Sequence, residues 1–315
     1  SVGQGCRGAV PGRGPAVRLA MSGARILLTG ADGFTGTHFS AAASSAGHEV
    51  IPLRVDLRDR EAVEKQVQTV EVDAVVHLAA ISFVGHADES AFYTVNVLGT
   101  AHLLSALSRL SHRPSSVLVA SSANVYGNCE ASPIAETQPP APVNHYACSK
   151  LAMEHMACTY TDRLPVVISR PFNYTGPGQT QQFLIPKMVD HFSRRAHEIE
   201  LGNLWVEREF NDIDLICSAY LGLLEHGVPG EVYNVCTGQP YRLQQVLDCL
   251  QAICGYNIAV RTNPALVRKS EVVRLCGDPA KLKRLFDSAG HPVPDVRLEQ
   301  TLQKMLNSSV KGAVA

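Results

Sequence analysis

Short, nearly continuous hydrophobic runs alternate with longer amphipathic stretches in the first half of the chain. The runs predicted to be strands are 24–29, 49–54, 73–80, 116–121 and 166–170. The stretches predicted to be helices are 37–46, 59–70, 96–110 and 146–160. A strand that helices cover on both faces is hydrophobic throughout, and strand–helix alternation gives parallel strands joined by right-handed crossovers. The pattern therefore predicts an α/β fold with a doubly wound, Rossmann-type parallel sheet.

The pattern loosens after residue 171. A loop is predicted over 174–182, helices over 183–195, 212–225 and 243–254, a strand over 231–236, and short helices from 262 onward. We assign 21–172 plus 211–240 to a dinucleotide-binding domain and 173–210 plus 241–310 to a smaller C-terminal substrate lobe. Residues 1–20 are rich in Gly, Pro and Arg and lack the hydrophobic run of a signal peptide. We interpret them as a disordered leader or a cloning remnant, with Met21 as the natural start.

Three glycines follow the first predicted strand and open the next helix: Gly30, Gly33 and Gly36. In a dinucleotide-binding turn the first permits the tight turn, the second lets the backbone approach a pyrophosphate, and the third lets helix and strand pack closely. The helix N-terminus then offers free N–H groups to the anion. The alternative is an ordinary glycine-rich turn, but the position between strand and helix favours a dinucleotide site.

The tip of the second strand bears on the choice of cofactor. An acidic side chain there binds the ribose hydroxyls of NAD, whereas a basic one accommodates the 2′-phosphate of NADP. The strand ends at Arg54 without an acidic residue, and Asp56 follows close enough to face the adenine. The sequence favours NADP(H) over NAD(H), although a solvated surface arginine is an alternative interpretation of Arg54.

Tyr146 and Lys150 stand four residues apart, on one face of a predicted helix. A phenol has an ordinary pKa of about 10, and a neighbouring ammonium lowers that value toward the working range. Ser122 follows a predicted strand and could polarise the same substrate oxygen. The alternative is an amphipathic helix with a half-buried Tyr and a solvated Lys, but the glycine turn upstream favours a catalytic group.

Composition excludes several classes of function. The formal net charge is −1, so the chain has no basic field for binding nucleic acid. Hydrophobic residues make up 45% and charged residues 18%, which suits a globular core, and no hydrophobic run is long enough to span a membrane. The nine cysteines include no Cys-x-x-Cys pair, so we predict reduced thiols in a cytoplasmic protein and no metal site.

The ordered motifs resemble those of the extended branch of the short-chain dehydrogenase/reductase family, from Arg25 to about Phe286. They are TGADGFTG (29–36), VVHLAA (75–80), NVLGT (96–100), SSANVYG (121–127), YACSK (146–150) and RPFNYTGPGQ (170–179). The resemblance implies a catalytic triad of Ser122, Tyr146 and Lys150. The residues it places at the cofactor are Gly30, Asp32, Gly33, Phe34, Gly36, Arg54, Asp56, Leu57, Leu78, Ala79, Ala80, Asn96, Tyr146, Lys150 and Pro171.

The later segments are similar to the members of that family that act on GDP-sugars, the GDP-mannose 4,6-dehydratases and the GDP-6-deoxy-4-keto-mannose reductases. The segments concerned are 171–179, 207–220, 232–239 and 268–278. By this resemblance Arg208 and Arg268 grip the diphosphate, as a planar guanidinium suits, and Glu271 binds a ribose. A surface salt bridge is the alternative for either arginine. The remaining residues expected at the substrate are Asn124, Asn173 and Lys187. Relatives of this kind are often homodimers, and we expect one here.

Departures from the relatives narrow the chemistry. A 4,6-dehydratase needs an additional acid and base just after the triad serine, where this chain has Ala123 and Asn124. The Cys and His of the epimerase-reductases have no counterpart, because Cys129 and His145 fall outside the matching positions; we interpret His145 as a loop residue without a catalytic task. We therefore expect NAD(P)H-dependent reduction of the 4-keto group of a nucleotide-linked 6-deoxyhexose, GDP-4-keto-6-deoxy-mannose to GDP-rhamnose or its C4 epimer. The alternatives are a nucleotide-sugar 4-epimerase, a 4,6-dehydratase that finds its acid elsewhere, and a non-catalytic regulatory member of the fold.

Overall fold

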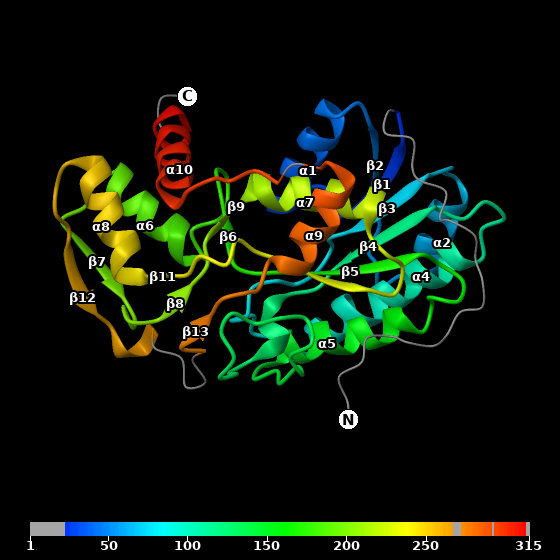
Figure 1. Ribbon diagram of the computed structural model, residues 1–315, viewed down its shortest axis with the longest axis horizontal. Helices are drawn as coiled ribbons and strands as arrows, with labels where there is room; N and C mark the ends of the chain where they lie inside the picture. The colour runs from blue at the N-terminus through cyan, green and yellow to red at the C-terminus, as the bar shows by residue number, and fades with distance from the viewer. Residues whose placement is uncertain (1–22, 267–271, 292, 313–315) are drawn as a thin grey trace.

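A six-stranded parallel sheet forms the centre of the computed structural model, which describes residues 23–266, 272–291 and 293–312 (Figure 1). Its strands lie in the order β10-β5-β4-β3-β1-β2. They are β1 (Arg25–Thr29), β2 (Glu49–Leu53), β3 (Ala74–His77), β4 (Ser116–Ala120), β5 (Val166–Pro171) and β10 (Val232–Val235). The order reverses between β1 and β3, so the loops that follow these two strands flank a crevice at the carboxyl edge of the sheet. The α/β fold class predicted from the sequence is confirmed.

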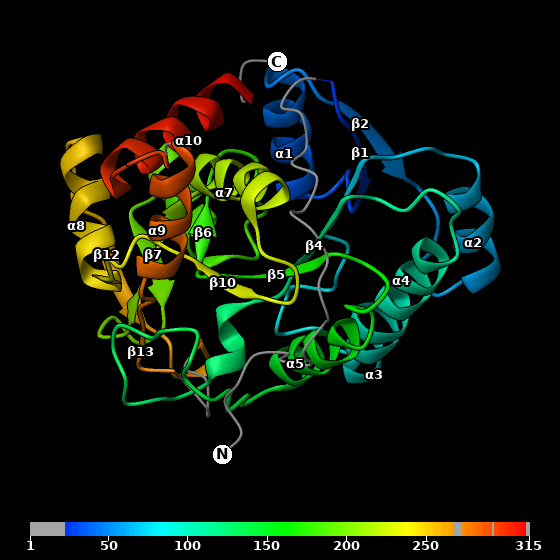
Figure 2. The same ribbon diagram turned by 45° about the vertical axis from the view of Figure 1, so that its right-hand side comes forward.

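Helices cover both faces of this sheet (Figure 2). On β1, Ile26 and Leu28 point into one hydrophobic core, while Leu27 between them points into the other. The first core is closed by α1 (Phe34–Ser45), α7 (Ile213–His226) and α9 (Ala280–Ala289). The second is closed by α2 (Arg60–Gln68), α4 (Thr100–Ser108) and α5 (His145–Cys158). Strand side chains alternate in direction, so two covered faces require the continuous hydrophobic runs seen in the sequence.

A smaller lobe with its own hydrophobic core extends from the carboxyl edge, on the left in Figure 1. It contains α6 (Leu184–Ser193), β7 (Glu198–Leu201), β8 (Glu207–Arg208), β11 (Tyr241–Arg242), α8 (Leu243–Cys254), β12 (Ala259–Thr262), η3 (Pro264–Leu266), β13 (Arg274–Leu275) and α10 (Leu298–Gly312). Shorter elements connect the two parts or border the cavity between them: α3 (Glu89–Tyr93), η1 (Thr94–Gly99), η2 (Ala123–Tyr126), β6 (Tyr174–Thr175) and β9 (Asn211–Asp212).

Several elements differ from those predicted. The helix expected over 96–110 begins as a π-helical segment, Thr94–Gly99, before α4 starts. The loop predicted over 174–182 contains the short strand β6, which pairs with β9. Helix α9 lies within 241–310, the range assigned to the lobe, yet Leu282 and Phe286 pack in the core beside the large sheet. Burial against α7 therefore overrides the sequence position of α9.

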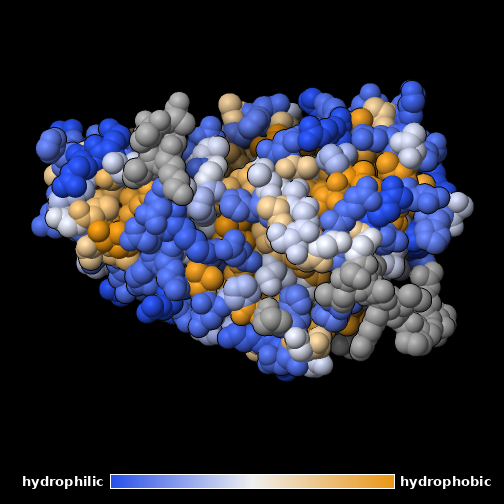
Figure 3. Space-filling view, turned by 90° about the horizontal axis from the view of Figure 1, so that it is seen from above, coloured by the Kyte–Doolittle hydropathy of each residue, from blue (hydrophilic) through white to orange (hydrophobic). Residues whose placement is uncertain are grey.

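The surface and the cysteines bear on the expected environment. In the part of the chain that the structure describes, no helix is both long and hydrophobic enough to cross a membrane. The face seen in Figure 3 is largely hydrophilic, with hydrophobic residues gathered in separate areas. The free cysteines among the described residues are Cys129, Cys148, Cys217, Cys236, Cys249, Cys254 and Cys276. Cys158, half-buried at the end of α5, is disulfide-bonded, so the prediction of reduced thiols does not extend to it.

Candidate active site

A cavity of about 780 Å³ lies between the carboxyl edge of the sheet and the lobe. Both parts contribute to its wall, from the turn after β1 to the N-terminal half of α6. Most residues expected at the cofactor or substrate line it: Gly30, Gly33, Phe34, Gly36, Leu78, Ala79, Ala80, Ser122, Asn124, Tyr146, Pro171, Asn173, Lys187 and Arg208. Side chains expected from distant sequence motifs thus meet at one concave surface.

The glycine turn after β1 brings backbone very close to backbone. Gly30 has φ +70°, and a Cβ there would lie 2.8 Å from the amide nitrogen of Ala79. A Cβ at Gly36 would lie 2.1 Å from the carbonyl oxygen of Gly30, so only glycine fits at the start of α1. Gly33 has an ordinary φ of −79°. Its lack of a side chain therefore serves no backbone conformation and instead leaves the N-terminus of α1 open to the cavity, which fits a bound pyrophosphate.

Tyr146 lies in the first turn of α5, and Ser122 follows β4, so both reach the cavity at the same edge of the sheet. They are 8% and 6% exposed. Burial raises the pKa of the Tyr146 phenol to about 12, and a hydrogen bond with Ser122 opposes that rise. The Ser122 hydroxyl also accepts from the amide N–H and side-chain amide of Asn124, at 3.2 and 3.1 Å. With its acceptor capacity used, the Ser122 hydroxyl is directed to act as a donor.

Lys150 lies one turn further along α5 and is 4% exposed. Its Nζ donates to the carbonyl oxygen of Ala120 at 2.8 Å, at the end of β4. Burial lowers the pKa of Lys150 to about 8, against an opposing attraction from Glu154. The ammonium is thus held at the catalytic edge with a pKa close to neutrality, where a change of charge can be coupled to a proton on the phenol.

A chain of buried hydrogen bonds joins the glycine turn to the catalytic helix. Thr29 Oγ1 accepts from the N–H groups of Leu78 and Ala79, so its hydroxyl donates to His77 Nδ1 at 2.7 Å. Thr100 Oγ1 donates to the carbonyl oxygen of Asn96, and His77 Nε2 lies 2.7 Å from the same hydroxyl. These partners require a neutral His77 that carries its proton on Nε2.

Asn96 continues this chain of hydrogen bonds. Its side-chain oxygen accepts from the Ile81 amide, and its Nδ2 donates to Ser149 Oγ at 3.0 Å. Ser149 in turn donates to the carbonyl oxygen of Tyr146. Asn96 is 0% exposed and does not line the cavity, so its described contacts position α5 rather than contact a ligand.

Five other residues expected at the cofactor are also absent from the cavity lining. Arg54 and Asp32 form an exposed ion pair at 3.0 Å. Asp56 pairs with Arg58, whose hydrogen bonds lower the pKa of Asp56 to about 2. Leu57 is buried in the sheet core, and Lys150 lies behind Tyr146 on α5. Arg54 and Asp32 remain together at the rim beside the glycine turn, because α1 starts where β2 ends.

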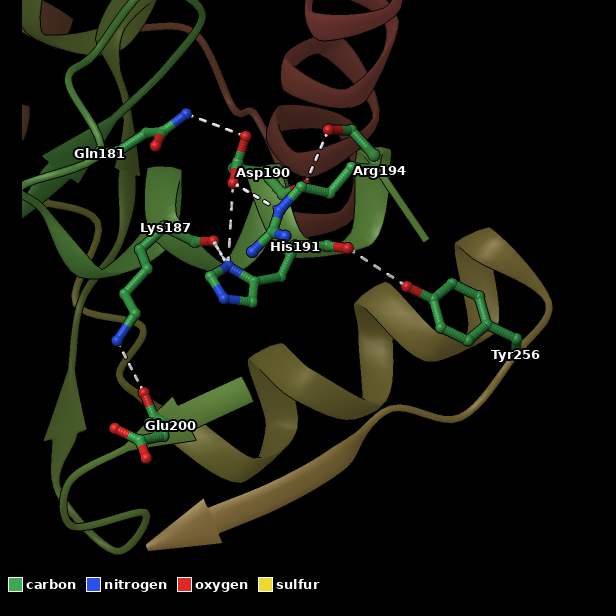
Figure 4. A network of polar contacts seen from close by, with 8 residues as sticks. Gln181, Lys187, Asp190, His191, Arg194, Glu200 and Tyr256 are labelled. Atoms are coloured by element: carbon green, nitrogen blue, oxygen red, sulfur yellow. Dashed lines mark hydrogen bonds and ion pairs between the residues drawn. The ribbon is translucent and has the colours of Figure 1, made fainter. Parts of the chain in front are cut away.

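On the lobe side, Lys187 extends from α6 to the backbone of β7, where its Nζ donates to the Glu200 carbonyl at 2.7 Å (Figure 4). Arg208 on β8 donates to the carbonyl oxygens of Glu207 and Val272. The backbone of Asn173 is held by two hydrogen bonds from Asn211. The two remaining substrate predictions, Arg268 and Glu271, lie outside the described residues.

Sequence reasoning missed the aromatic part of the wall. Phe83, in the loop after β3, and Phe183, before α6, meet edge to face with ring centroids 6.2 Å apart. They join the two parts of the molecule across the cavity mouth. Neither belongs to a periodic or spaced motif, and the signal that could have found Phe83 is its place directly after a strand end at the carboxyl edge. His145 is the first residue of α5 and contacts Tyr93 and Glu89 at the surface, so it is helical rather than a loop residue.

Titratable groups are scarce in the cavity. Among the described residues that line it, Glu200 is the sole carboxylate and there is no His or Cys. The Glu200 carboxylate accepts from Asn263 and lies near Arg261, on the lobe rather than beside the triad. The described side chains next to Tyr146 can therefore donate or accept one proton through the phenol, but supply no second acid or base.

A His/Glu group lies apart from the cavity, near the C-termini of α7 and α9. Potential ligand atoms of Glu225, His226 and His291 lie within 4.8 Å of one another. Each already has a protein partner: Glu225 pairs with His226 at 3.0 Å, and His291 Nε2 lies 3.2 Å from the Ser218 carbonyl. Adjacent helical residues such as Glu225 and His226 point about 100° apart, which is a poor start for one metal ion.

A glycine turn at the switch point of a parallel sheet, opposite a Ser, a Tyr and a Lys four residues on, is typical of the extended short-chain dehydrogenases and reductases. The family model described as GDP-mannose 4,6 dehydratase matches residues 52–305. The chain belongs to this family, as the resemblance of its motifs predicted.

Two relatives have names that describe a reaction at C4 of a deoxysugar. The chain is 35% identical over 263 residues to the GDP-6-deoxy-D-talose 4-dehydrogenase of Aggregatibacter actinomycetemcomitans, which covers 82% of this chain and 90% of that protein. It is 35% identical over 298 residues to the GDP-6-deoxy-D-mannose reductase of Pseudomonas aeruginosa, which covers 90% of this chain and 96% of that protein.

Solved structures agree with the fold over almost the whole chain. The structure of RMD from Pseudomonas aeruginosa complexed with NADPH has a TM-score of 0.81 and 33% identity, and covers 91% of this chain and 97% of that one. A protein of Burkholderia cenocepacia provisionally called an epimerase has a TM-score of 0.85 and 43% identity, with coverages of 91% and 98%. A nicotinamide cofactor is common to this group, whereas the choice between NADP and NAD varies within it.

Proposed function

We propose that the protein reduces the 4-keto group of a GDP-linked 4-keto-6-deoxyhexose, forming GDP-rhamnose or its C4 epimer, GDP-6-deoxytalose. The observation that carries the proposal is the cavity in which one proton donor, Tyr146, stands with Ser122 and no second acid or base. Carbonyl reduction needs one proton at the carbonyl oxygen, and a bound nicotinamide supplies the hydride.

The residues divide the proton chemistry between them. Tyr146, whose pKa of about 12 keeps it protonated near neutrality, donates its proton to the oxygen at C4. Ser122 donates a hydrogen bond to the same oxygen and stabilises the charge that develops there. Lys150, charged below about pH 8, stabilises the phenolate that remains. The names of the two relatives, which concern the same carbon of a GDP-linked 6-deoxyhexose, support this assignment.

The test is a spectrophotometric assay with purified protein, NADPH and freshly prepared GDP-4-keto-6-deoxy-mannose. We expect the absorbance of the reduced cofactor to fall, and the Tyr146→Phe variant to be slower by a factor on the order of 10² to 10⁴ while it still binds NADPH. Tyr93→Phe, at the protein surface, is the matched control and should keep full activity. Absence of cofactor oxidation by the unaltered protein would reject the proposal.

The alternatives give different results in the same experiment. A 4-epimerase would retain NAD and interconvert two nucleotide-sugars without net cofactor oxidation. A 4,6-dehydratase would convert GDP-mannose to a keto product without added NADPH, but the carboxylate it needs is missing beside Ser122 among the described residues. A non-catalytic regulatory member would bind the ligands without turnover, and the combination of Ser122, Tyr146 and Lys150 argues against it.

We further propose NADP(H) as the preferred cofactor. Arg54 stands at the tip of β2, with its side chain 63% exposed and paired to Asp32 at the rim of the glycine turn. A 2′-phosphate in this place would compete with the Asp32 carboxylate for the guanidinium. Arg54→Ser should therefore raise KM for NADPH roughly tenfold and leave KM for NADH unchanged. Arg58→Ser, which removes a similarly exposed arginine four residues away, is the control.

A homodimer completes the proposal. Tyr93 and Leu98 are 36% and 52% exposed, on α3 and η1 beside α5. Exposed hydrophobic side chains on neighbouring helices suit a contact with a second copy. Sedimentation velocity should give twice the mass of the chain, and Leu98→Lys should shift the protein toward the monomer.

A further inference from the structure

A buried network of charged residues lies directly behind the catalytic helix. Arg170 on β5 donates to both carboxylate oxygens of Glu154 on α5, through Nε at 2.9 Å and a terminal nitrogen at 2.6 Å. Ser121, which precedes the triad serine, donates to the same carboxylate. Glu154 is 4% exposed and Arg170 is 6% exposed.

Further contacts fix the guanidinium of Arg170 in place. It lies over the ring of Tyr126, 4.8 Å from the centroid. The Tyr126 hydroxyl donates to Asn234 Oδ1 at 2.7 Å, and Asn234 is the residue of β10 opposite Arg170. The carboxylate of Glu154 is therefore held in one position by groups from β4 and β5, and those groups are themselves anchored by β10.

Such a network contributes little net stability. Removing two charges from water costs several kcal/mol per ion, and replacing a buried pair by hydrophobic residues is often neutral or stabilising. Its position suggests a different use. Glu154 stands four residues after Lys150, on the same face of α5, and its attraction opposes the effect of burial on the Lys150 ammonium.

We propose that Glu154 is a positioning residue for the proposed reduction: its carboxylate, held by Arg170 and Ser121, keeps the ammonium of Lys150 charged at the catalytic edge. The charged or titratable groups around the Lys150 side chain and its partner are Tyr146 and Glu154 on the same helix, His77 on β3 and Arg170 on β5. His77 is neutral, because burial lowers its pKa to about 3. Glu154 is thus the group among these that supplies a negative charge near Lys150.

The inference rests on the proposed function and predicts a pH effect that a purely structural role would not produce. The activity of the unaltered enzyme should fall above about pH 8 as Lys150 loses its proton. In Glu154→Gln this alkaline limb should move down by about one pH unit, since a nearby opposite charge shifts a pKa by about that amount or more. Glu154→Asp, which keeps the charge, should return the limb most of the way. Met153→Leu is the packing control, since the Met153 sulfur lies 3.9 Å from Lys150 Nζ and carries no charge; its limb should stay in place.

A second measurement does not depend on the substrate. In protein labelled with ¹³C at the lysine side chains, the Lys150 signal is identified by its loss in Lys150→Arg and followed through a pH titration without substrate. Glu154→Gln should lower the titration midpoint of Lys150 by about one pH unit, and Met153→Leu should leave it unchanged. An unchanged midpoint in folded Glu154→Gln, or the same shift in Met153→Leu, would overturn the inference. A shifted midpoint in a protein that does not oxidise NADPH would refute the proposed function alone.

Discussion

At the scale of single residues, His77 shows how hydrogen-bond partners determine a protonation state. One ring nitrogen must accept from Thr29 and the other must donate to Thr100, and this pattern requires the neutral imidazole. Burial, together with the charge of Lys150, lowers the pKa of His77 to about 3. A protonated His77 would lose its acceptor and break the link between the glycine turn and Asn96.

This pKa predicts a dependence of stability on pH. In the unfolded chain His77 takes up a proton below its ordinary value of 6.5, whereas in the folded protein it does so near 3. Between these values the unfolded state binds more protons, so the free energy of unfolding falls as the pH falls, by up to roughly 5 kcal/mol from this group. Urea denaturation at pH 7, 6, 5 and 4 should show a smaller loss for His77→Gln than for the unaltered protein. Parallel curves would contradict the prediction.

The identities of the triad residues and the glycines could be predicted from spacing along the chain, but their supporting partners could not. Tyr146 and Lys150 are four residues apart, whereas the bonds that orient α5 join Asn96 to Ser149 across 53 positions. The pairing of Arg54 with Asp32 rather than with a ligand likewise depends on the spatial proximity of β2 and the turn after β1. Contacts of this kind arise from tertiary packing and leave no local pattern.

At the scale of elements, α1 illustrates the close approach on which the cofactor site depends. The helix begins at Phe34, three residues earlier than the pattern predicted, because the turn residues themselves form its first turn. Gly36 is buried within that turn, and its backbone lies against the carbonyl of Gly30. Any side chain at this position must push α1 away from β1.

We therefore expect Gly36→Ala to abolish measurable dinucleotide binding and to destabilise the fold by about 1–3 kcal/mol, the usual cost of overpacking. The neighbouring Thr37→Ala changes an exposed side chain and should keep both properties. Thermal shift with and without NADPH, together with urea denaturation, separates the two effects. Normal cofactor binding by Gly36→Ala would show that the helix can move without harm.

Elements with strong periodicity were predicted best. The amphipathic helix 243–254 has the predicted bounds, whereas the helix expected over 96–110 starts with the π-helical segment Thr94–Gly99. That segment contains Asn96, whose side chain bonds both backbone groups of Ile81. A π-helical turn commonly occurs where a functional side chain must be placed, and hydrophobic periodicity carries no sign of it.

At the scale of the whole molecule, the cavity depends on the relation between the Rossmann core and the lobe. A contact between α10 and α7 helps to set that relation: Thr301 donates to Asp212 Oδ2 at 2.7 Å, and Lys304 reaches Asp212 and Asp214. Asp212 is 1% exposed and also caps α7 through the Asp214 amide. The last described helix is thus tied to the start of a helix that packs on the large sheet.

Thr301→Val should lower the free energy of unfolding by about 1–3 kcal/mol, because it leaves a buried carboxylate oxygen without its hydroxyl donor. It should also raise KM for the sugar nucleotide more than KM for NADPH, since α10 belongs to the lobe. Gln303→Ala, two positions further on and exposed, is the control for helix α10. Equal stability of the two variants would show that Lys304 alone maintains this contact.

The path of the chain between the two cores has a consequence for the history of such proteins. After β5 the chain enters the lobe at α6, returns for α7 and β10, leaves again for α8, returns for α9 and ends in the lobe with α10. No single stretch of gene encodes the lobe, so recombination could not exchange it as a cassette. New sugar preferences would instead have to arise by substitutions made in place, each compatible with two interleaved cores.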